Sequence, residues 1–470
     1  MKRIAIIGSG IAGLTAAYYL EKARQSGTQL QWTLFEKSDR LGGVIQTERR
    51  DGFVLEAGPD SFLTIKPDAA RLCADLGLAG QIISSNDSER KTYILVKGRL
   101  VPIPQGLEFM VPTRIWPMAS TLLFSFKTKL RMAAELFSSR RSEGGDESVG
   151  DFVRRHFGPE MVDRVAEPLL AGVYGGSAER LSVRAVLPRF AEMERESGSL
   201  VRATLKAKAM AKPGTKPQPL FTSLKHGMRQ MVEALAGALP KSFVRLQQQN
   251  LLLRPVNEDW QVETGHIKEQ FQAVLLAVPA PAAAAMLRQF HPSLIEGLAR
   301  IEYTSSVAVA LAYESAELPA GHGFLVPRSE NRKMMACTFV HKKFPHRAPN
   351  GASLLRCFFS SSRLPDLLSY SDQDFVAMAR QELKDILGLD TTPIFTRTFR
   401  WDRAMAQYET GHLERVAAME KIIAEMPGFH IIGNSFHGIG VPDCIKSARQ
   451  AVEQITSGAS QPVVLGQLKN

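Results

Sequence analysis

The order of hydrophobic and polar positions predicts an α/β unit at the start of the chain. Lys2–Ile7 is a short apolar run with several β-branched residues, which is typical of a buried strand. Good helix formers follow Gly13, and a second apolar run, Gln31–Phe35, ends at the acidic residue Glu36. We therefore expect a strand, a helix and a second strand in this part of the chain.

Later apolar runs predict a second group of strands. Thr92–Val96 and Leu100–Pro104 have the spacing of a hairpin. Val307–Tyr313 and Ser353–Phe359 predict strands of an open sheet that forms the floor of a substrate-binding region. Phe271–Pro279 predicts a buried strand ended by proline, at which a split nucleotide-binding region resumes.

Three other segments have mixed patterns. We expect Glu167–Gly176 to break a helical pattern, with its glycine-rich end in a pocket wall, and Lys206–Pro219 to be a mobile basic loop. Gly106–Arg141 is apolar and basic together. Such helices either lie on an anionic membrane or line an apolar substrate cavity, and both interpretations stay open.

The residues Gly8-Ser9-Gly10-Ile11-Ala12-Gly13 form a G-x-G-x-x-G motif between the first strand and the helix, the context in which it binds a dinucleotide. In such motifs the glycines permit a tight turn, the approach of a pyrophosphate to the backbone, and close packing of helix on strand. The N-terminus of the helix offers N–H groups and partial positive charge to the phosphates. Glu36 lies about 20 residues further on, where a ribose hydroxyl needs an acceptor and a 2′-phosphate would be repelled.

A second glycine pair, Gly42 and Gly43, changes the expected ligand from a nicotinamide to a flavin nucleotide. It permits another close approach of the backbone to the ligand, just after the acidic residue. The segment from Glu36 to Gly43 resembles the signature of the flavin amine oxidase superfamily. We also expect the loop Gly58–Ser61, which a short strand delivers, to face the cofactor.

A glycine-rich loop near the C-terminus predicts a further contact with the cofactor. An apolar strand ends at Gly433, and the chain then reaches Pro442 and Asp443, two residues suited to a first helical turn. The N–H groups of this helix can point at a flavin ring, where negative charge builds up on reduction.

Composition and charge narrow the class of protein. The chain has 470 residues and a net charge of +11, which favours anionic partners, and it has no nucleic-acid-binding motif. The four cysteines are far apart and predict free thiols in a reducing compartment, without a zinc or other metal site. We recognise no signal peptide and no run of about 18 apolar residues. We therefore expect a cytoplasmic protein, with any membrane contact peripheral.

With both ends in view, the chain resembles the oxygen-dependent protoporphyrinogen/coproporphyrinogen oxidases, a branch of the flavin amine oxidase superfamily. The similarity runs over nearly the whole length. Besides the widely shared glycine unit, the segments that carry it are Glu36–Gly43, Glu56–Leu63, Glu167–Gly175, Gly227-Met228, Gln407-Tyr408, Gly411-His412 and Gly438–Ile445. Of these, Gly438–Ile445 and Glu167–Tyr174 are much more particular to this branch.

The resemblance implies non-covalent FAD, oxidation of a porphyrinogen to a porphyrin, and reoxidation of the flavin by oxygen. It also implies an α/β protein with three domains. A discontinuous Rossmann-like FAD-binding domain would comprise 1–65, 206–285 and 399–470. A substrate-binding α+β sheet domain would comprise 66–105 and 286–398, and 106–205 would form a helical domain that can contact a membrane.

Carried over position by position, the resemblance implies the following flavin contacts: Gly8, Ser9, Gly10, Ile11, Ala12, Gly13, Glu36, Lys37, Gly42, Gly43, Val44, Gly58, Pro59, Asp60, Ser61, Leu251, Trp401, Gly438, Ile439, Gly440 and Val441. The carboxylates of the substrate need cations, for which Lys66, Arg90 and Lys91 are candidates, and Val173 is expected against the macrocycle. We name no catalytic acid or base, because the flavin accepts the hydride and the protein positions the substrate.

Three questions stay open at this point. The substrate is either coproporphyrinogen III, with four propionates, or protoporphyrinogen IX, with two; the net charge favours the tetra-anion only slightly. An amine oxidase or polyene desaturase on the same fold is an alternative, and so is a carrier protein that has lost the flavin. The sequence does not indicate an oligomeric state.

Overall fold

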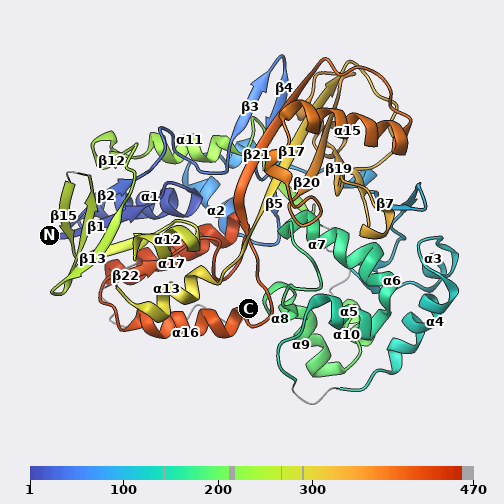
Figure 1. The fold of residues 1–470 in the computed structure, drawn as a ribbon, viewed down its shortest axis with the longest axis horizontal. Coiled ribbons are helices and arrows are strands. Elements are labelled where there is room, and N and C mark those ends of the chain that lie inside the picture. Colours follow the sequence, from blue (N-terminus) through green and yellow to red (C-terminus); the bar gives the residue numbers. More distant parts are fainter. Residues whose placement is uncertain (141–143, 211–217, 266, 288–289, 458–470) are drawn as a thin grey trace.

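The computed structural model describes residues 1–140, 144–210, 218–265, 267–287 and 290–457. Two sheets dominate the structure, one five-stranded and one seven-stranded. A group of helices, α3 to α10, lies beside the second sheet at the lower right of Figure 1. The larger strands and helices predicted from the hydrophobic pattern are present, with ends displaced by a few residues.

The five-stranded sheet is parallel throughout and draws on three separate parts of the chain. In sheet order its strands are β12 (Val244–Arg245), β2 (Leu30–Phe35), β1 (Lys2–Ile7), β16 (Ala273–Leu276) and β22 (Phe429–Ile431). The predicted strand that ends at Pro279 is therefore β16, which pairs directly with β1. This is the expected discontinuous Rossmann-like arrangement, in which the buried strands have apolar residues on both faces.

Helices from both ends of the chain cover one face of this sheet. The helices of this layer are α1 (Ile11–Gln25), α2 (Asp68–Asp75), α11 (Arg229–Gly237) and α17 (Val441–Ser457). The other face packs against strands β13 (Leu252–Val256), β14 (Asp259–Thr264) and β15 (Ile267–Phe271) and helices α12 (Ala280–Met286), α13 (Pro292–Ala299) and α16 (His412–Ala424). Figure 1 shows α1 in blue beside α17 in red, so the two ends of the chain meet in one layer.

The seven-stranded sheet is antiparallel except for the pair β18–β7. In sheet order its strands are β21 (Phe395–Ala406), β17 (Tyr303–Tyr313), β20 (Ser353–Ser360), β19 (Ala336–Phe339), β18 (Gly323–Leu325), β7 (Thr92–Val96) and β8 (Arg99–Pro102). Helix α15 (Asp372–Leu387) covers one face. Phe53 and Leu55, from the hairpin of β3 (Thr47–Arg50) and β4 (Phe53–Glu56), pack on the other face.

The helical region is built from short helices around an apolar core. They are α3 (Ile115–Ser120), α4 (Phe126–Ala134), α5 (Val149–Phe157), α6 (Pro159–Met161), α7 (Glu167–Tyr174), α8 (Val183–Val186), α9 (Pro188–Ser197) and α10 (Leu200–Met210). The Ser148 side chain caps α5 by accepting from the Asp151 N–H, which satisfies one of the free donors of the first turn. Across the described residues, every helix is too short or too polar to cross a bilayer.

Three expectations about local structure are corrected. Glu167–Gly176 does not break the helix: a π-helical segment, Val162–Ala166, leads into α7, and Pro168 fits its first turn, where no N–H is needed. Lys206–Met210 is the end of α10 and not a loop, whereas 211–217 lie outside the described residues. Strand β21 belongs to the seven-stranded sheet along its whole length, so the boundary expected at 398/399 falls inside a strand.

Candidate cofactor-binding site

The first turn of the chain contains both a tight contact and an open space. A Cβ atom at Gly13 would lie 1.9 Å from the Gly8 carbonyl oxygen, so α1 can approach β1 only with glycine at this position. A Cβ at Gly10 would meet no atom within 4 Å. Gly10 is also the N-cap of α1, and no side chain caps the helix. The backbone N–H groups at this helix start are therefore available to an anion, as the motif predicts.

Glu36, at the end of β2, is nearly buried beside this turn. Its Oε2 accepts from the N–H and the hydroxyl of Ser9, at 2.8 and 2.7 Å, and its Oε1 accepts from the N–H and hydroxyl of Ser38, at 2.9 and 2.8 Å. Burial works to raise the pKa of Glu36, but these donors outweigh it and lower that pKa below its ordinary value. Glu36 is therefore an ionised acceptor that also holds the glycine turn in place.

The second glycine pair lies directly against the first. The Gly42 N–H donates to the Ser9 carbonyl oxygen at 2.9 Å, and a Cβ at Gly43 would lie 3.2 Å from the Gly10 Cα. A Cβ at Gly58 would lie 2.0 Å from the Val44 carbonyl oxygen. Three predicted segments, distant in sequence, are thus brought together by backbone contacts.

The loop Gly58–Ser61 is held from the side of the seven-stranded sheet. Trp401 Nε1 on β21 donates to the Ala57 carbonyl oxygen at 2.8 Å, which places Trp401 beside this loop. Lys343 Nζ lies 2.9 Å from Asp60 Oδ2. Burial works to raise the pKa of Asp60, but the nearby charges of Lys343 and Arg356 hold that pKa well below its usual range.

The C-terminal glycine loop is positioned by a buried tyrosine. The Gly438 N–H donates to the Tyr408 hydroxyl at 2.8 Å, and that hydroxyl donates to the Asn434 carbonyl oxygen at 2.9 Å. The His412 ring stacks on the Tyr408 ring with 4.0 Å between centroids. The loop leads into α17, whose helix packs beside α1. The predicted contacts Gly438, Ile439, Gly440 and Val441 therefore lie at the start of a helix that neighbours the first glycine turn.

Other predicted residues lie in different surroundings. Leu251 is 5% exposed and belongs to the core that contains Ile7 and Phe35. Lys37 is exposed after the end of β2. Lys66 Nζ lies 2.7 Å from both carboxylate oxygens of Asp443, at the start of α17. The candidate substrate cation Lys66 is therefore already paired with a carboxylate.

The remaining substrate candidates lie on the surface. Arg90 is exposed and 3.9 Å from Asp87, and Lys91 is exposed before β7. Val173 is 54% exposed on α7, which leaves it free to contact a ligand. Contact between these three residues and a substrate stays a prediction.

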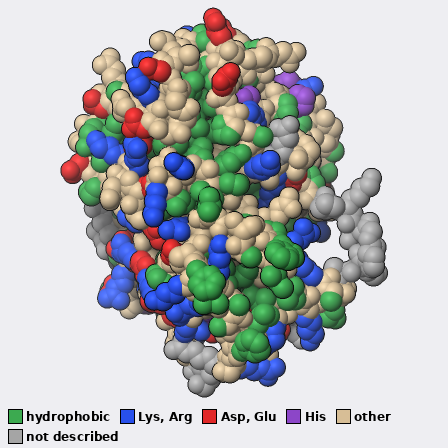
Figure 2. Space-filling view, turned by 90° about the vertical axis from the view of Figure 1, so that its right-hand side faces the viewer, with side chains coloured by type: hydrophobic (Ala, Val, Ile, Leu, Met, Phe, Trp, Pro, Cys, Tyr) green, Lys and Arg blue, Asp and Glu red, His purple; other side chains and the backbone are tan. Residues whose placement is uncertain are grey.

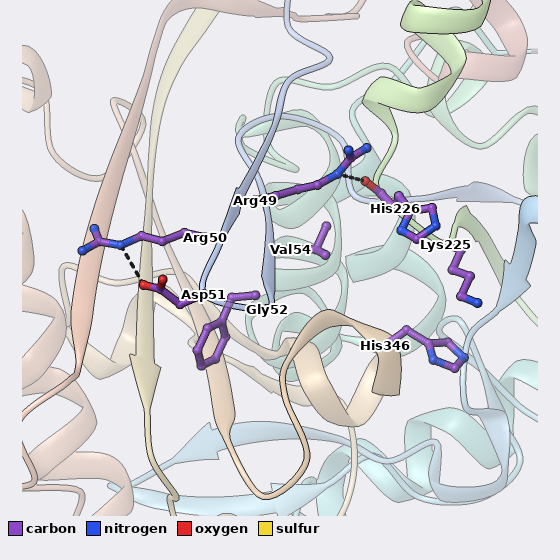
Figure 3. A pocket seen from close by; sticks show the side chains of 9 residues that line it. Arg49, Arg50, Asp51, Gly52, Val54, Lys225, His226 and His346 are labelled. Atoms are coloured by element: carbon purple, nitrogen blue, oxygen red, sulfur yellow. Dashed lines mark hydrogen bonds and ion pairs between the residues drawn. The ribbon is translucent and has the colours of Figure 1, made fainter.

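Two surface hollows in the described residues lie apart from every predicted cofactor or substrate residue. One, of about 450 Å³, is lined by residues of the β3–β4 hairpin with Lys225, His226 and His346. Figure 3 shows Arg49 directed at the His226 backbone oxygen, and Arg50 at Asp51. The second, of about 590 Å³, lies beside α4, α5 and α9.

Reasoning from sequence missed two side chains that organise the site. Arg356 on β20 donates to the carbonyl oxygens of Ala57 and Gly58. Asp443 pairs with Lys66 and accepts from the Gly440 N–H at 3.2 Å. A signal for Arg356 was present, because an arginine inside the apolar run Ser353–Phe359 needs a buried partner.

These residues fit an adenine dinucleotide on structural grounds. Gly10 leaves open the space that a pyrophosphate needs, the start of α1 offers uncapped N–H groups, and Glu36 is an ionised acceptor one strand away. The tight contacts at Gly13 and Gly58 place the backbone of three segments around that space.

Comparisons with known proteins agree with this geometry. The family model of flavin containing amine oxidoreductase matches residues 11–456. Coproporphyrinogen III oxidase of Bacillus subtilis (strain 168) is 34% identical over 460 residues, which cover 96% of this chain and 97% of that protein. The enzyme of the same name from Staphylococcus aureus is 30% identical over 97% of this chain and 99% of its own length.

A solved structure is also similar along the whole chain. The crystal structure of a protein from Exiguobacterium sp. 255-15, provisionally named a protoporphyrinogen oxidase, has a TM-score of 0.86 and 31% identity. The match covers 97% of this chain and 99% of that one. The chain therefore belongs to the family of flavin-containing amine oxidoreductases and is an FAD-dependent oxidoreductase.

Proposed function

We propose that this protein oxidises coproporphyrinogen III to coproporphyrin in haem biosynthesis, with FAD as electron acceptor and molecular oxygen as the oxidant that restores FAD. The observation that carries the proposal is the full-length similarity to coproporphyrinogen III oxidases, at 34% identity, in a chain that keeps the dinucleotide-binding geometry. Protoporphyrinogen IX is the other substrate to test.

The residues of the predicted FAD site have distinct tasks in this proposal. When bound, FAD supplies the chemistry, because it accepts hydride from the reduced macrocycle. The start of α1 binds the phosphates, and Glu36 accepts from the ribose. The start of α17 would place the positive end of its helix dipole where negative charge builds up. The Gly438 and Gly440 N–H groups already donate to Tyr408 and Asp443 and therefore fix the loop.

The seven-stranded sheet offers an apolar floor for the substrate. The register places Ala308 directly between Phe399 on β21 and Phe358 on β20. Directly opposite residues of antiparallel strands share a face, and the same face carries Arg356 and Trp401, two positions along their strands. Both phenylalanine rings are only partly buried. We infer that they flank the macrocycle, with small Ala308 leaving room between them.

We also propose that the helical region contacts an anionic membrane surface. Large apolar side chains are exposed on and beside α3 and α4, including Ile115, Trp116, Leu122, Phe126 and Phe137 at 76–85%. Exposed Lys127 and Arg131 lie on the same helix as Phe126. Figure 2 views the side of the molecule that carries these helices and shows apolar side chains gathered on its lower part, bordered by basic ones. Exposed aromatic residues bordered by cations are typical of interfacial binding.

This membrane contact predicts a specific loss on substitution. Trp116→Ser with Phe126→Ser removes two of the exposed aromatic rings, so binding to vesicles rich in phosphatidylglycerol should fall about tenfold or more. Sedimentation of protein with vesicles measures it. Ile394→Ser, an exposed apolar residue outside this region, is the matched control. Equal binding by the double variant and the control would contradict the contact.

The central test is an assay of the purified protein with both porphyrinogens, prepared anaerobically. We expect loss of the flavin absorption bands on mixing with coproporphyrinogen III, and porphyrin fluorescence with oxygen uptake on admission of air. Faster turnover of protoporphyrinogen IX would reassign the substrate. Turnover of a primary amine without porphyrinogen oxidation would overturn the proposal.

A further inference from the structure

A cluster of five charged side chains lies between the two sheets, and only one of them, Asp60, belongs to the residues predicted from sequence to bind the flavin. The cations Lys343, Arg347 and Arg356 all come from the substrate-side segment of α14 (Val340–Lys343) and β20. The carboxylates Glu56 and Asp60 both come from the segment that leads into the predicted FAD-binding loop. Arg347 is 1% and Arg356 is 7% exposed, so both side chains are almost completely buried.

Each cation of the cluster reaches across to the loop or to its supports. Lys343 pairs with Asp60, and Arg347 Nη2 lies 3.1 Å from Glu56 Oε1. Arg347 also donates to the Ser223 hydroxyl at 2.7 Å, and Ser223 donates to the Asp60 carbonyl oxygen at 2.7 Å. The loop is thus held through both its side chains and its backbone.

Arg356 differs from the other two cations because it holds backbone and not carboxylates. Its Nη2 donates to the Ala57 carbonyl oxygen at 3.0 Å and to the Gly58 carbonyl oxygen at 2.8 Å. These two successive carbonyls stand at the point where β4 ends and the loop begins. Buried carbonyl groups outside a sheet ladder need donors, and this arginine supplies them from the opposite sheet.

The free-energy cost of burying the Arg356 guanidinium argues against a purely structural role for this charge. Burying a guanidinium costs more than its contacts return in many proteins, and an apolar side chain of similar volume is often as stable. The Nε atom of Arg356 has no hydrogen-bond partner among the described residues. The apolar neighbours on β20, Leu354 and Phe358, show that this sheet face accommodates apolar side chains.

We propose that Arg356 is a positioning residue for the cofactor: it fixes the loop 57–61 in the conformation that receives FAD, so that the substrate-binding sheet sets the affinity for the flavin. This rests on the assignment of Gly58–Ser61 to the FAD site. Two side chains of that sheet, Arg356 and Trp401, both donate to the Ala57 carbonyl oxygen. Gly58 packs tightly against Val44, so a shift of the loop would also displace the backbone beside Gly42 and Gly43.

Arg363, in the turn that follows β20, provides a matched control. Its guanidinium also donates to two backbone carbonyls, those of Met334 and Val326, and its Nε also lacks a partner among the described residues. The carbonyls it holds lie in the connection between β18 and β19 and not in the cofactor loop. If any arginine that binds two carbonyls were needed only for stability, substitution at either position should change the Kd for FAD to the same extent. If Arg356 positions the cofactor loop, only its substitution should raise the Kd for FAD.

The experiment removes FAD from the full-length protein and titrates it back, following flavin fluorescence. Arg356→Met should raise the Kd for FAD about 30-fold, from the loss of two charge-assisted hydrogen bonds. Arg356→Lys should recover part of the affinity, because it keeps the charge but not the fork geometry. Arg363→Met should lower the melting temperature of the apo-protein comparably and leave the Kd within about twofold.

Equal changes in FAD affinity for Arg356→Met and Arg363→Met would overturn the proposal. If Arg356→Met does not fold, the pair Arg356→Lys and Arg363→Lys provides the same comparison with smaller changes. The titration contains no porphyrinogen, so its result does not depend on the substrate. Wild-type protein that binds FAD but oxidises neither porphyrinogen would refute the proposed function and leave this inference intact.

Discussion

The two sheets that face the cofactor site are built by different means. On the five-stranded side the site consists of backbone: glycines at 10, 13, 43 and 58 leave space or permit close contact, and helix starts supply N–H groups. On the seven-stranded side it consists of side chains, with Trp401 and Arg356 reaching the loop and Phe358 and Phe399 as the floor proposed for the substrate. A ligand with phosphates suits the first side, and the apolar ring system of a porphyrinogen suits the second.

This difference explains what each side tolerates. A backbone site is destroyed by adding a single Cβ, whatever its chemistry, because the contact is steric. In a site made of side chains, the binding affinity changes gradually with the size and charge of each substituted residue. A residue on a neighbouring strand can also replace a lost contact. Substitutions on the two sides should therefore separate cofactor affinity from substrate affinity.

The largest expected effect distinguishes two glycines of one motif. Gly13→Ala places a Cβ 1.9 Å from the Gly8 carbonyl oxygen, so we expect a loss of about 3 kcal/mol or more in the free energy of unfolding. Gly10→Val meets open space in the apo-protein but fills the position proposed for the pyrophosphate. The melting temperature of apo Gly10→Val should stay near wild type while its FAD affinity falls more than about 100-fold.

Thermal unfolding of the two apo-proteins and FAD titration measure these effects. The neighbouring Ala12→Ser, which keeps nearly the same size, serves as control and should retain yellow colour. A Gly10→Val protein that retains its full complement of FAD would refute the open space as the phosphate site.

The second effect concerns substrate affinity on the seven-stranded side. Phe399→Ala with Phe358→Ala removes both rings that flank Ala308. The KM for coproporphyrinogen III should rise about tenfold or more, from lost apolar contact, while the Kd for FAD stays within about twofold. Steady-state kinetics and the same FAD titration check this. If the Kd for FAD rises as much as the KM, the two sheets do not control cofactor and substrate affinity separately.

A third, smaller effect concerns Lys66. Its pairing with Asp443 predicts that Lys66→Ala loosens the start of α17, so that FAD affinity falls a few fold while the KM for the porphyrinogen is unchanged. Asp443→Asn should reproduce the change, because it breaks the same pair. A rise in KM in Lys66→Ala alone would show instead that the ammonium binds a substrate carboxylate, as the sequence predicts.

The smallest effect is a dependence of stability on pH. Burial lowers the pKa of His412 to about 4, whereas the unfolded side chain titrates near about 6.5. Between these values the unfolded state binds more protons, so His412 should cost the native state roughly 1–2 kcal/mol between pH 7 and pH 5, and His430, whose pKa burial also lowers to about 4, adds to the loss. Denaturant unfolding at both pH values measures it. His412→Asn should flatten this slope, and an unchanged slope would show that other groups dominate.

Sequence reasoning located the backbone side of the site better than the side-chain side, for a physical reason. The glycine motif and Glu36 lie within one continuous segment and carry their geometry in their spacing. Arg356 reaches the cofactor loop from a strand about 300 residues away, and pairing across sheets has no signature in spacing. Trp401, which also reaches the loop from a distant strand, was expected only through the family resemblance. Lys66 was predicted to bind a substrate carboxylate, whereas its partner in the structure, Asp443, comes from the other end of the chain.

The errors in local structure have a similar origin. Pro168 and the glycines after Tyr174 indicated a break, yet the π-helical segment before them allowed the helix to continue to Gly175. The boundary at 398/399 was wrong because β21 continues as one strand from Phe395 to Ala406, held by its pairing with β17. The division into three domains otherwise stays a prediction.

Rapid anaerobic mixing of the FAD-loaded protein with coproporphyrinogen III shows whether the bound flavin oxidises this substrate. We expect the flavin absorption bands to disappear within the time of one turnover and to return when oxygen is admitted, with coproporphyrin formed. Bands that persist unchanged with both coproporphyrinogen III and protoporphyrinogen IX, in protein that demonstrably holds FAD, would contradict this expectation.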